Sequence, residues 1–442
     1  MKIQLSDHFT YKRLLRFVTS SILMMICTSL YSIVDGFFVS NFVGKTPFAA
    51  VNLIMPVMMG GGAIGFMIGT GGSAVVAITL GTGNRERANQ YFSMLVYTSL
   101  FLGLLLSTLG FIFIRPISVA LGASGELLGY CIIYGRILFI GETAFILQNI
   151  FQSFFVTAEK PELSLKLSIL SGLTNMVLDF LFIAIFHWGI SGAAIATIMG
   201  QFVGGIIPLL YFSRKNGSLL QLTKTRFYGK ILLKTCTNGS SELVTNLSSS
   251  IVNILYNYQF MKLVGENGVA AYGIVMYVNF IFMAIFFGYS IGIAPLTSYH
   301  YGAGNHDELK NLFDKSIRIL VVSSLVLTLT AEVLTMPLVR IFASYDAELF
   351  NMTCHGFRLY ALAFLFMGIN VWGSSFFTSL GDGLISAVIS FLRTLVFQLA
   401  VVLILPHFFG IDGIWMSIVV AELLALAITL LFFITRRKQY HY

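Results

Sequence analysis

Charged residues are scarce in this chain of 442 residues. Asp, Glu, Lys and Arg together make up only 10% of the sequence, whereas a soluble domain usually carries about 25%. Hydrophobic residues account for 57% of the chain, and its mean hydropathy is +0.86. This shortage of charge excludes an ordinary soluble protein, because the folded chain would lack a polar surface. The composition instead predicts an all-α polytopic membrane protein.

Cysteine is also rare, and its spacing is irregular. The four cysteines form no CxxC pair, so neither a zinc site nor a dithiol redox motif is indicated. The sequence contains no Walker A loop and no HExxH helix, which are typical of nucleotide-binding proteins and metalloproteases. We therefore predict that the protein is not an enzyme and uses no cofactor.

The net charge of +8 has a topological interpretation. When the N-terminus is placed inside the cell, most of the 27 Lys and Arg residues fall in cytoplasmic segments, and Arg393 is counted among them. Basic residues are typically enriched in the cytoplasmic loops of membrane proteins. The pattern predicts a multi-pass protein of the plasma membrane with both termini in the cytoplasm. It gives no reason to expect a nucleic-acid partner.

A repeated sequence motif divides the chain into two equal halves. GTGNRERANQYF begins at Gly81 and GAGNHDELKNLF begins at Gly302, so the shift is 302 − 81 = 221, half of 442. The same register relates Pro116 to Pro337, and it aligns GISG with GIDG. A constant register along most of the chain indicates the duplication of one module.

The apolar segments predict the domain organisation. A helical span needs about 20 apolar residues, and roughly twelve such spans fit the sequence. We predict a first six-helix lobe over residues 1–212, a cytoplasmic linker over 213–230, a second six-helix lobe over 231–435 and a cytoplasmic tail over 436–442. Because each copy crosses the membrane an even number of times, a pseudo-twofold axis along the membrane normal should relate the lobes.

Two acidic residues fall inside predicted spans of the first lobe. Asp35 and Asp179 each lie roughly 10 Å below the outer surface, and Thr197 on the following span reaches the same depth. Tyr31 is one helical turn from Asp35, and Asn175 is one turn from Asp179. Ionisable groups inside a membrane are costly and usually functional, and this set of oxygen ligands suits a hard cation or a proton. The alternative is that each residue makes only a helix–helix hydrogen bond.

The second lobe does not repeat this set of residues. The repeat places Tyr256 opposite Asp35 and Val401 opposite Asp179. Glu242 is the main buried acid predicted for the second lobe. The sequence leaves open whether Glu242 attracts a cationic substrate or serves as a structural hydrogen-bond acceptor.

Methionine and phenylalanine are abundant, with 17 and 41 copies. Most of these side chains should pack in the core or face lipid. Met25, Phe151 and Met283 are candidates for lining a central substrate cleft, because thioether and aromatic surfaces adapt to varied ligands.

These features resemble the multidrug and toxic compound extrusion (MATE) family over nearly the whole chain. The specific marks are Asp35 with Tyr31 before it, the Asn175-x-x-x-Asp179 pair, and GAAIAT ending at Thr197. The resemblance implies that Asp35, Asn175, Asp179 and Thr197 bind a coupling Na⁺ or H⁺, with Tyr31 in the surrounding network. An acidic pair that another branch carries in the second lobe is not matched here, so the sequence is closer to the DinF-like branch.

The resemblance implies a secondary active antiporter. It would export amphipathic, cationic organic compounds in exchange for H⁺ or Na⁺, by alternating access in the lipid bilayer, and would act as a monomer. The alternative is a flippase for lipid-linked saccharides, as in distant relatives. A flippase should need a basic cavity for pyrophosphate. The predicted spans hold few internal Lys or Arg residues, so the sequence favours the exporter.

Overall fold

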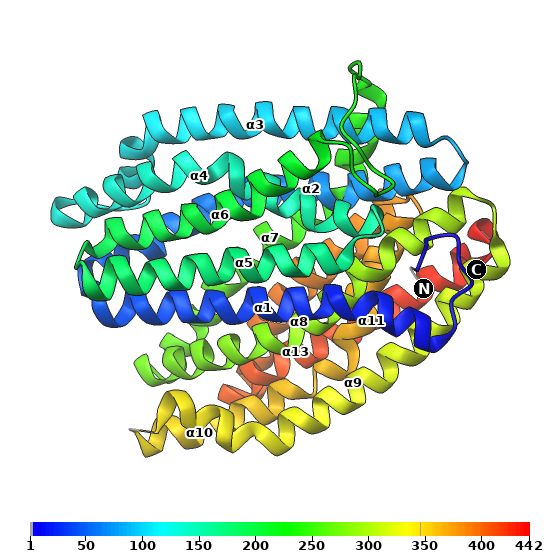
Figure 1. Cartoon of the computed structure of the whole chain (residues 1–442). Coiled ribbons are helices and arrows are strands. Elements are labelled where there is room, and N and C mark those ends of the chain that lie inside the picture. Colours follow the sequence, from blue (N-terminus) through cyan, green and yellow to red (C-terminus); the bar gives the residue numbers. More distant parts are fainter. Residues whose placement is uncertain (1–2, 345) are drawn as a thin grey trace.

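The computed structural model describes residues 3–344 and 346–442, which form a helical bundle with no β-strand in these two ranges (Figure 1). The first half contains α1 (Tyr11–Phe42), α2 (Lys45–Gly81), α3 (Arg85–Ala120), α4 (Gly125–Thr157), α5 (Pro161–Asp179), the π-helical η1 (Phe180–Ile185) and α6 (Gly189–Ser213). The second half contains α7 (Gly229–Leu263), α8 (Glu266–Gly302), α9 (His306–Ala343), α10 (Ala347–Ala361), α11 (Phe364–Ser379), α12 (Gly383–Phe391), the π-helical η2 (Leu392–Val396) and α13 (Phe397–Tyr440).

The helices separate into two lobes that follow the two halves of the sequence. In the first lobe, α4 packs against α2, α3 and α6, and α5 packs against α1 and α6. In the second lobe, α11 packs against α8 and α9, and α7 packs against α12 and α13. Figure 1 shows both chain termini at one end of the bundle. We call this end the terminal end and the opposite end the distal end.

The described helices supply twelve membrane spans when the bent pair, the divided helix and the more polar α7 are counted. Nine described helices are individually long and apolar enough to cross a membrane, and the α10–α11 pair, bent by 51°, supplies another span. The 58-residue stretch Gly383–Tyr440 divides at Gly410, whose φ of 58° and ψ of −129° are not helical. The equivalent Gly189 also has a positive φ, of 57°, where η1 gives way to α6. With the 35-residue but more polar α7, the predicted two-lobe all-α architecture is confirmed.

The repeated GTGN and GAGN motifs form the same turn in both lobes. Gly83 and Gly304 have φ angles of 81° and 66°, a region that glycine adopts without the steric cost of a side chain. The following Asn84 and Asn305 cap α3 and α9. Each side-chain oxygen accepts a hydrogen bond from the backbone N–H three residues later, at 3.0 and 3.1 Å. The sequence repeat is therefore also a structural repeat.

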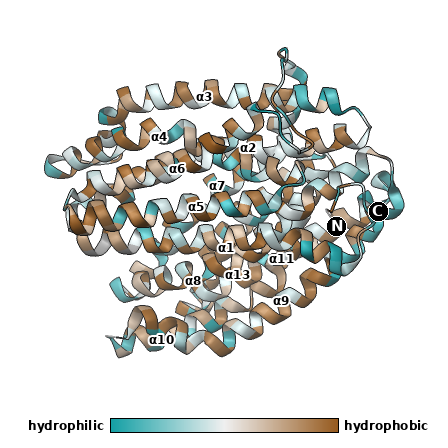
Figure 2. Ribbon diagram, viewed as in Figure 1, coloured by the Kyte–Doolittle hydropathy of each residue, from teal (hydrophilic) through white to brown (hydrophobic). Residues whose placement is uncertain are grey.

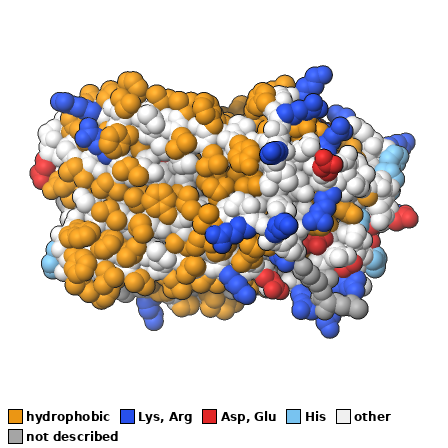
Figure 3. Space-filling model, turned by 45° about the horizontal axis from the view of Figure 1, so that its top comes forward, with side chains coloured by type: hydrophobic (Ala, Val, Ile, Leu, Met, Phe, Trp, Pro, Cys, Tyr) orange, Lys and Arg blue, Asp and Glu red, His pale blue; other side chains and the backbone are white. Residues whose placement is uncertain are grey.

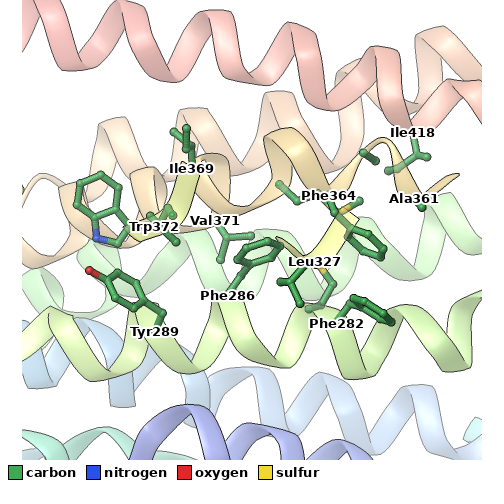
Figure 4. Packing of buried hydrophobic residues seen from close by; sticks show 14 of the residues in the cluster. Phe282, Phe286, Tyr289, Leu327, Ala361, Phe364, Ile369, Val371, Trp372 and Ile418 are labelled. Carbon is green, nitrogen blue, oxygen red and sulfur yellow. The ribbon is translucent and has the colours of Figure 1, made fainter. Parts of the chain in front are cut away.

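Aromatic side chains fill the core of the second lobe (Figure 4). Phe282 of α8 stacks on Phe364 of α11, with ring centroids 5.0 Å apart. Trp372 of α11 is only 1% exposed and lies 5.1 Å from the ring of Phe376. Such close packing of rings joins α8 and α11 in one core.

The surface of the bundle fits a bilayer. Figure 2 shows hydrophobic residues along most of the helices and hydrophilic residues at the terminal end. In Figure 3 a broad hydrophobic region lies between two ends that carry Lys and Arg side chains. This is the distribution expected for helices that cross hydrocarbon and end among lipid head groups.

The connection between the lobes is held against the first lobe. α6 ends at Ser213 and α7 begins at Gly229, so residues 214–228 form the connection. Its backbone N–H groups bind α3: Gln221 donates to the Asn89 side chain at 2.9 Å, and Thr223 donates to Oγ of Ser93 at 2.8 Å. The linker predicted over 213–230 is therefore a docked segment rather than a loose tether.

The C-terminal segment is largely helical. The last membrane span was expected to end at residue 435 with a cytoplasmic tail after it, and α13 continues through that tail to Tyr440. The hydroxyl of Tyr442 donates to the carbonyl of Phe433 at 3.0 Å, and Tyr442 is only 3% exposed. Most of the predicted tail over 436–442 is thus helix, because its aromatic side chains pack back onto the second lobe.

The two lobes approach each other closely at the terminal end. A Cβ added to Gly71 of α2 would lie 2.2 Å from the carbonyl oxygen of Thr235 in α7. A Cβ added to Gly288 of α8 would lie 2.4 Å from Cα of Ile22 in α1. Only a residue without a side chain permits such an approach. The bundle is therefore closed between the lobes at its terminal end.

Candidate functional site

The structure brings Asp35, Asn175 and Asp179 together in the first lobe. α1 packs against both α5 and η1, and Asp179 is the last residue of α5 before the π-helical segment. Asp179 is fully buried, Asn175 is 5% exposed and Asp35 is half-buried. The Asp35 and Asp179 carboxyl groups lie close enough to interact, and the Asn175 side chain is beside both.

Several oxygens of this cluster form no well-aligned hydrogen bond, although the Asn175 side chain lies close to both carboxyl groups. In the described part of the chain, these oxygens are Asp35 Oδ1, both carboxylate oxygens of Asp179, and Asn175 Oδ1. Unpaired carboxylate oxygens in an apolar interior are costly unless a proton or a cation neutralises them. The donor set consists only of oxygen atoms and therefore fits H⁺ or a hard cation such as Na⁺.

Tyr31 connects this cluster to a hydrogen-bonded network. Its ring packs against Gly172 of α5, where an added Cβ would lie 2.9 Å from the ring, and its hydroxyl lies beside the Gln148 side chain of α4. Gln148 donates to Ser171 at 3.3 Å, and Ser171 donates to the carbonyl of Gly200 at 2.7 Å. The network thereby ties α1, α4, α5 and α6 together around the acidic pair.

Thr197 lies at the depth expected but is not shown to touch either carboxylate. On α6, Gly192 packs against Phe182 and Gly200 packs against Asn175, so Thr197 between them is level with the end of α5. Its hydroxyl donates to the carbonyl of Ala193 at 3.0 Å, within its own helix. Only the acceptor lone pairs of the hydroxyl remain for a bound cation.

Two further buried residues of the first lobe were not predicted as site residues from the sequence. Tyr134 of α4 is 1% exposed and lies near both Asp35 and Asp179. Glu142, also on α4, is fully buried against Gly61, and both its carboxylate oxygens lack a partner among residues 3–344 and 346–442. Their positions inside the α4 span were a signal, but only packing shows what they face.

The second lobe contains a buried ion pair. Arg393 Nε donates to both carboxylate oxygens of Glu422, at 2.9 and 3.0 Å. Asn370 donates to the same carboxylate at 2.7 Å and to the Glu422 carbonyl at 2.9 Å. Arg393 is 8% exposed, so counting it among cytoplasmic loop residues was wrong. It lies in η2, inside the fifth span of the second lobe.

This ion pair occupies the place of the neutral network in the first lobe. A shift of 222 relates Gln148 to Asn370, Ser171 to Arg393 and Gly200 to Glu422. In each lobe, the fourth, fifth and sixth spans meet through these residues. After duplication, both lobes retain a polar junction between these three spans. The junction is neutral in the first lobe and contains an ion pair in the second.

Glu242 lies near this junction without bonding to it. It is half-buried on α7, within range of the charge of Arg393. Toward the distal end, polar residues follow Glu242 at helical spacing on one face of α7, namely Asn246, Ser250, Asn253 and Asn257. A polar face on a membrane span needs water or protein against it rather than lipid.

The three residues suggested as cleft lining differ in their burial. Phe151 is 1% exposed and stacks on Phe212 with ring centroids 5.6 Å apart, in the core of the first lobe. Met283 is 8% exposed in the core of the second lobe. Both side chains are buried in lobe interiors in this structure, and Phe151 also lines a small cavity beside Gln148, so their place on a substrate cleft stays a prediction. Met25 is half-buried on α1.

Comparisons with known proteins agree with this architecture. The MatE family model matches residues 20–181 and 243–404, one segment in each lobe. Multidrug export protein MepA of Staphylococcus saprophyticus is 23% identical over 97% of this chain and 94% of its own length. A crystal structure of MATE in complex with MaL6 has a TM-score of 0.93 at 23% identity, covering 98% of both chains. An outward-facing multidrug resistance MATE transporter also has a TM-score of 0.93, at 24% identity, covering 99% of this chain and 98% of that one.

Proposed function

The chain belongs to the MatE family of membrane transporters, which are not enzymes, and from this premise we propose that it is a cation-coupled exporter of organic compounds. Its similarity to multidrug export proteins over nearly their full length supports an efflux role. The same similarity favours drug export over the flippase alternative. Placement nearer the DinF-like branch stays a prediction.

The observation that carries the proposal is the set of unpaired oxygens at Asp35, Asn175 and Asp179. A site that leaves several buried acceptors without donors is prepared for H⁺ or Na⁺. The neighbouring Thr197 hydroxyl adds an acceptor at the same level, and Tyr31 fixes the position of α1 against α5. We expect ion binding here to favour one arrangement of the lobes over the other.

The conformational cycle would use the contact between the lobes. The lobes are closed at the terminal end. In the opposite state, α2 and α7 would separate and admit substrate from the side of the termini. A bound cation can drive this exchange only through its different affinity for the two states.

The substrate we propose is amphipathic and cationic. Glu242 and the polar face of α7 offer acceptors and negative charge on a helix that contacts the first lobe. The hydrophobic side chains around this face would hold the apolar part of such a compound. The protein would act as a monomer in the plasma membrane, with both termini in the cytoplasm.

Orientation can be tested by thiol labelling. Single cysteines at Lys215 in the linker and at Ser124 before α4 would be made in a variant lacking the four native cysteines. Intact cells should label Ser124→Cys, but not Lys215→Cys, with an impermeant thiol reagent. Labelling of the linker from outside would reverse the proposed orientation and the direction of transport.

The coupling proposal is tested in proteoliposomes with Na⁺ and pH gradients imposed separately. Wild-type protein should concentrate a cationic dye against its gradient with one of the two ions. Folded Asp35→Asn and Asp179→Asn variants should bind the dye but fail to concentrate it. Undiminished concentrative transport in both variants would refute the coupling site. Asp314→Asn, at an exposed acid of α9, is the matched control.

A further inference from the structure

A cleft of about 240 Å³ opens at the terminal end where the two lobes meet. α2 and α3 of the first lobe form one wall, and the beginning of α7 from the second lobe forms the other. Apolar side chains from both walls, including Val75, Ile78 and Ile231, line part of it. Arg87 of α3 and Lys234 of α7 bring two positive charges to the same cleft. The coupling ion and the exported substrate, as proposed above, make no use of these residues.

Both cations are available to a ligand. Arg87 and Lys234 are exposed, and within the described ranges neither side chain makes an ion pair or a hydrogen bond. The neighbouring Arg85 behaves differently: it donates to the carbonyls of Leu219 and Ser218 at 3.1 and 2.8 Å and so fastens the linker. Arg87, unlike Arg85, makes no such hydrogen bond to the carbonyl groups of the described linker residues.

The rest of the lining favours an anion as well. It contains no acidic residue among the described positions, and it contains the hydroxyl of Thr82 and the amide of Asn84. The oxygen of Asn84 caps α3, which leaves its NH₂ group as a donor. Glu86 is next to Arg87 in sequence, but adjacent helical residues do not face each other. An anion in the cleft therefore meets donors and positive charge without a competing carboxylate.

The surroundings point to a lipid rather than a free anion. Large apolar side chains on the segment that leads into α7 and on its first turns are exposed, with Phe227 72% and Leu233 67% accessible. The cleft also lies at the end of the membrane spans, where lipid head groups are found. A phosphate group between Arg87 and Lys234 would leave its acyl chains along this apolar surface. Basic residues at such a position attract anionic lipids.

We propose that the cleft between α2, α3 and α7 binds the phosphate head group of an anionic phospholipid and thereby stabilises closure of the lobes at the terminal end. Its two cations come from different lobes, so separation of the lobes would divide the site. A lipid that bridges Arg87 and Lys234 binds the closed state more tightly than the open state. This difference in affinity shifts the equilibrium toward closure.

The test measures lipid binding and does not depend on transport. Purified wild-type protein in neutral detergent would be titrated with phosphatidylglycerol, with zwitterionic phosphatidylcholine and with inorganic phosphate, while thermal unfolding is followed. Phosphatidylglycerol should raise the unfolding midpoint by several degrees. The double variant Arg87→Ala/Lys234→Ala should bind it about 30-fold more weakly, because each basic residue contributes about 1 kcal/mol to such binding.

The control variant removes two positive charges, as the cleft variant does. Arg214→Ala/Lys215→Ala removes two exposed bases from the linker, outside the cleft, and should retain the wild-type response. Equal stabilisation of the cleft variant and the control, or an equal response to phosphatidylcholine, would overturn the proposal. If inorganic phosphate at millimolar concentration gave the whole effect, the site would hold a free anion instead of a lipid. A cleft variant that unfolds early is replaced by Arg87→Gln/Lys234→Gln, which keeps more of the side-chain packing.

Discussion

Gly81 of α2 and Gly302 of α8 lie against each other's helices in a reciprocal contact. A Cβ added to Gly81 would be 2.1 Å from the carbonyl oxygen of Tyr299, and one added to Gly302 would be 2.1 Å from that of Ile78. Both pairs keep the repeat spacing, since 302 − 81 and 299 − 78 are each 221. The internal twofold axis therefore passes between α2 and α8 at the terminal end, where the lobes close.

The first prediction is that larger residues at this contact block closure. Gly81→Val or Gly302→Val should destabilise the closed state by about 1–3 kcal/mol through overpacking. Spin-label distances across the terminal end should lengthen, and transport should fall, while the protein remains inserted. Gly60→Ala and Gly273→Ala are the controls on the same two helices, because an added Cβ meets no atom within 4 Å at either position. Unchanged distances in the valine variants would contradict this role.

The second prediction concerns the acidic pair. If Asp35 and Asp179 form one ion site, the double variant Asp35→Asn/Asp179→Asn should lose no more gradient-driven efflux than either single variant. Thr197→Ala should do less harm, because it removes one neutral acceptor. Efflux rates of the folded variants give the comparison. Additive losses would show that the two carboxylates act at separate sites.

The third prediction concerns the buried ion pair of the second lobe. Arg393→Gln should lower the free energy of unfolding by about 3–5 kcal/mol, because it leaves Glu422 charged and buried. The double variant Arg393→Gln/Glu422→Gln should recover much of this loss. Thermal unfolding in detergent measures both, with the exposed Lys438→Gln as control. A double variant less stable than either single one would mean that the pair stabilises the lobe beyond mutual neutralisation.

The fourth prediction separates the two roles of Glu242. If its charge attracts substrate, Glu242→Gln should weaken the binding of cationic dyes and leave neutral compounds of similar size unaffected. If it is structural, both classes should lose affinity and the unfolding temperature should fall. Binding assays with paired ligands distinguish these outcomes. Glu348→Gln, at an exposed acid at the start of α10, should change neither measurement.

The fifth prediction concerns the segment before α1, which joins the lobes. The N–H of Leu5 donates to Glu159 of the first lobe at 2.7 Å, while the N–H of Phe9 donates to Glu308 of the second at 2.9 Å. Nδ1 of His8 also lies 2.5 Å from Oε2 of Glu308. Glu308→Ala should loosen this bridge and increase labelling of a single cysteine buried at the closed end. The neighbouring exposed Asp307→Ala should leave labelling unchanged.

The sequence alone determined the features that depend on local or periodic information. The turns at Gly83 and Gly304 follow from the backbone freedom of glycine and from the asparagine caps that come next. The two lobes follow from the length of the apolar runs and from the constant register of the repeat. Even the shared depth of Asp35 and Asp179 follows from counting helical residues.

Only the tertiary structure decided what each helix faces. Hydropathy places a residue along a span but not around it, because lipid and protein core are equally apolar. Arg393 therefore resembled a loop residue until Glu422 was found beside it, and the sequence could not show that the ring of Phe151 stacks on Phe212. The rotation of helices that are distant in sequence sets these contacts, and side-chain packing within each lobe fixes that rotation.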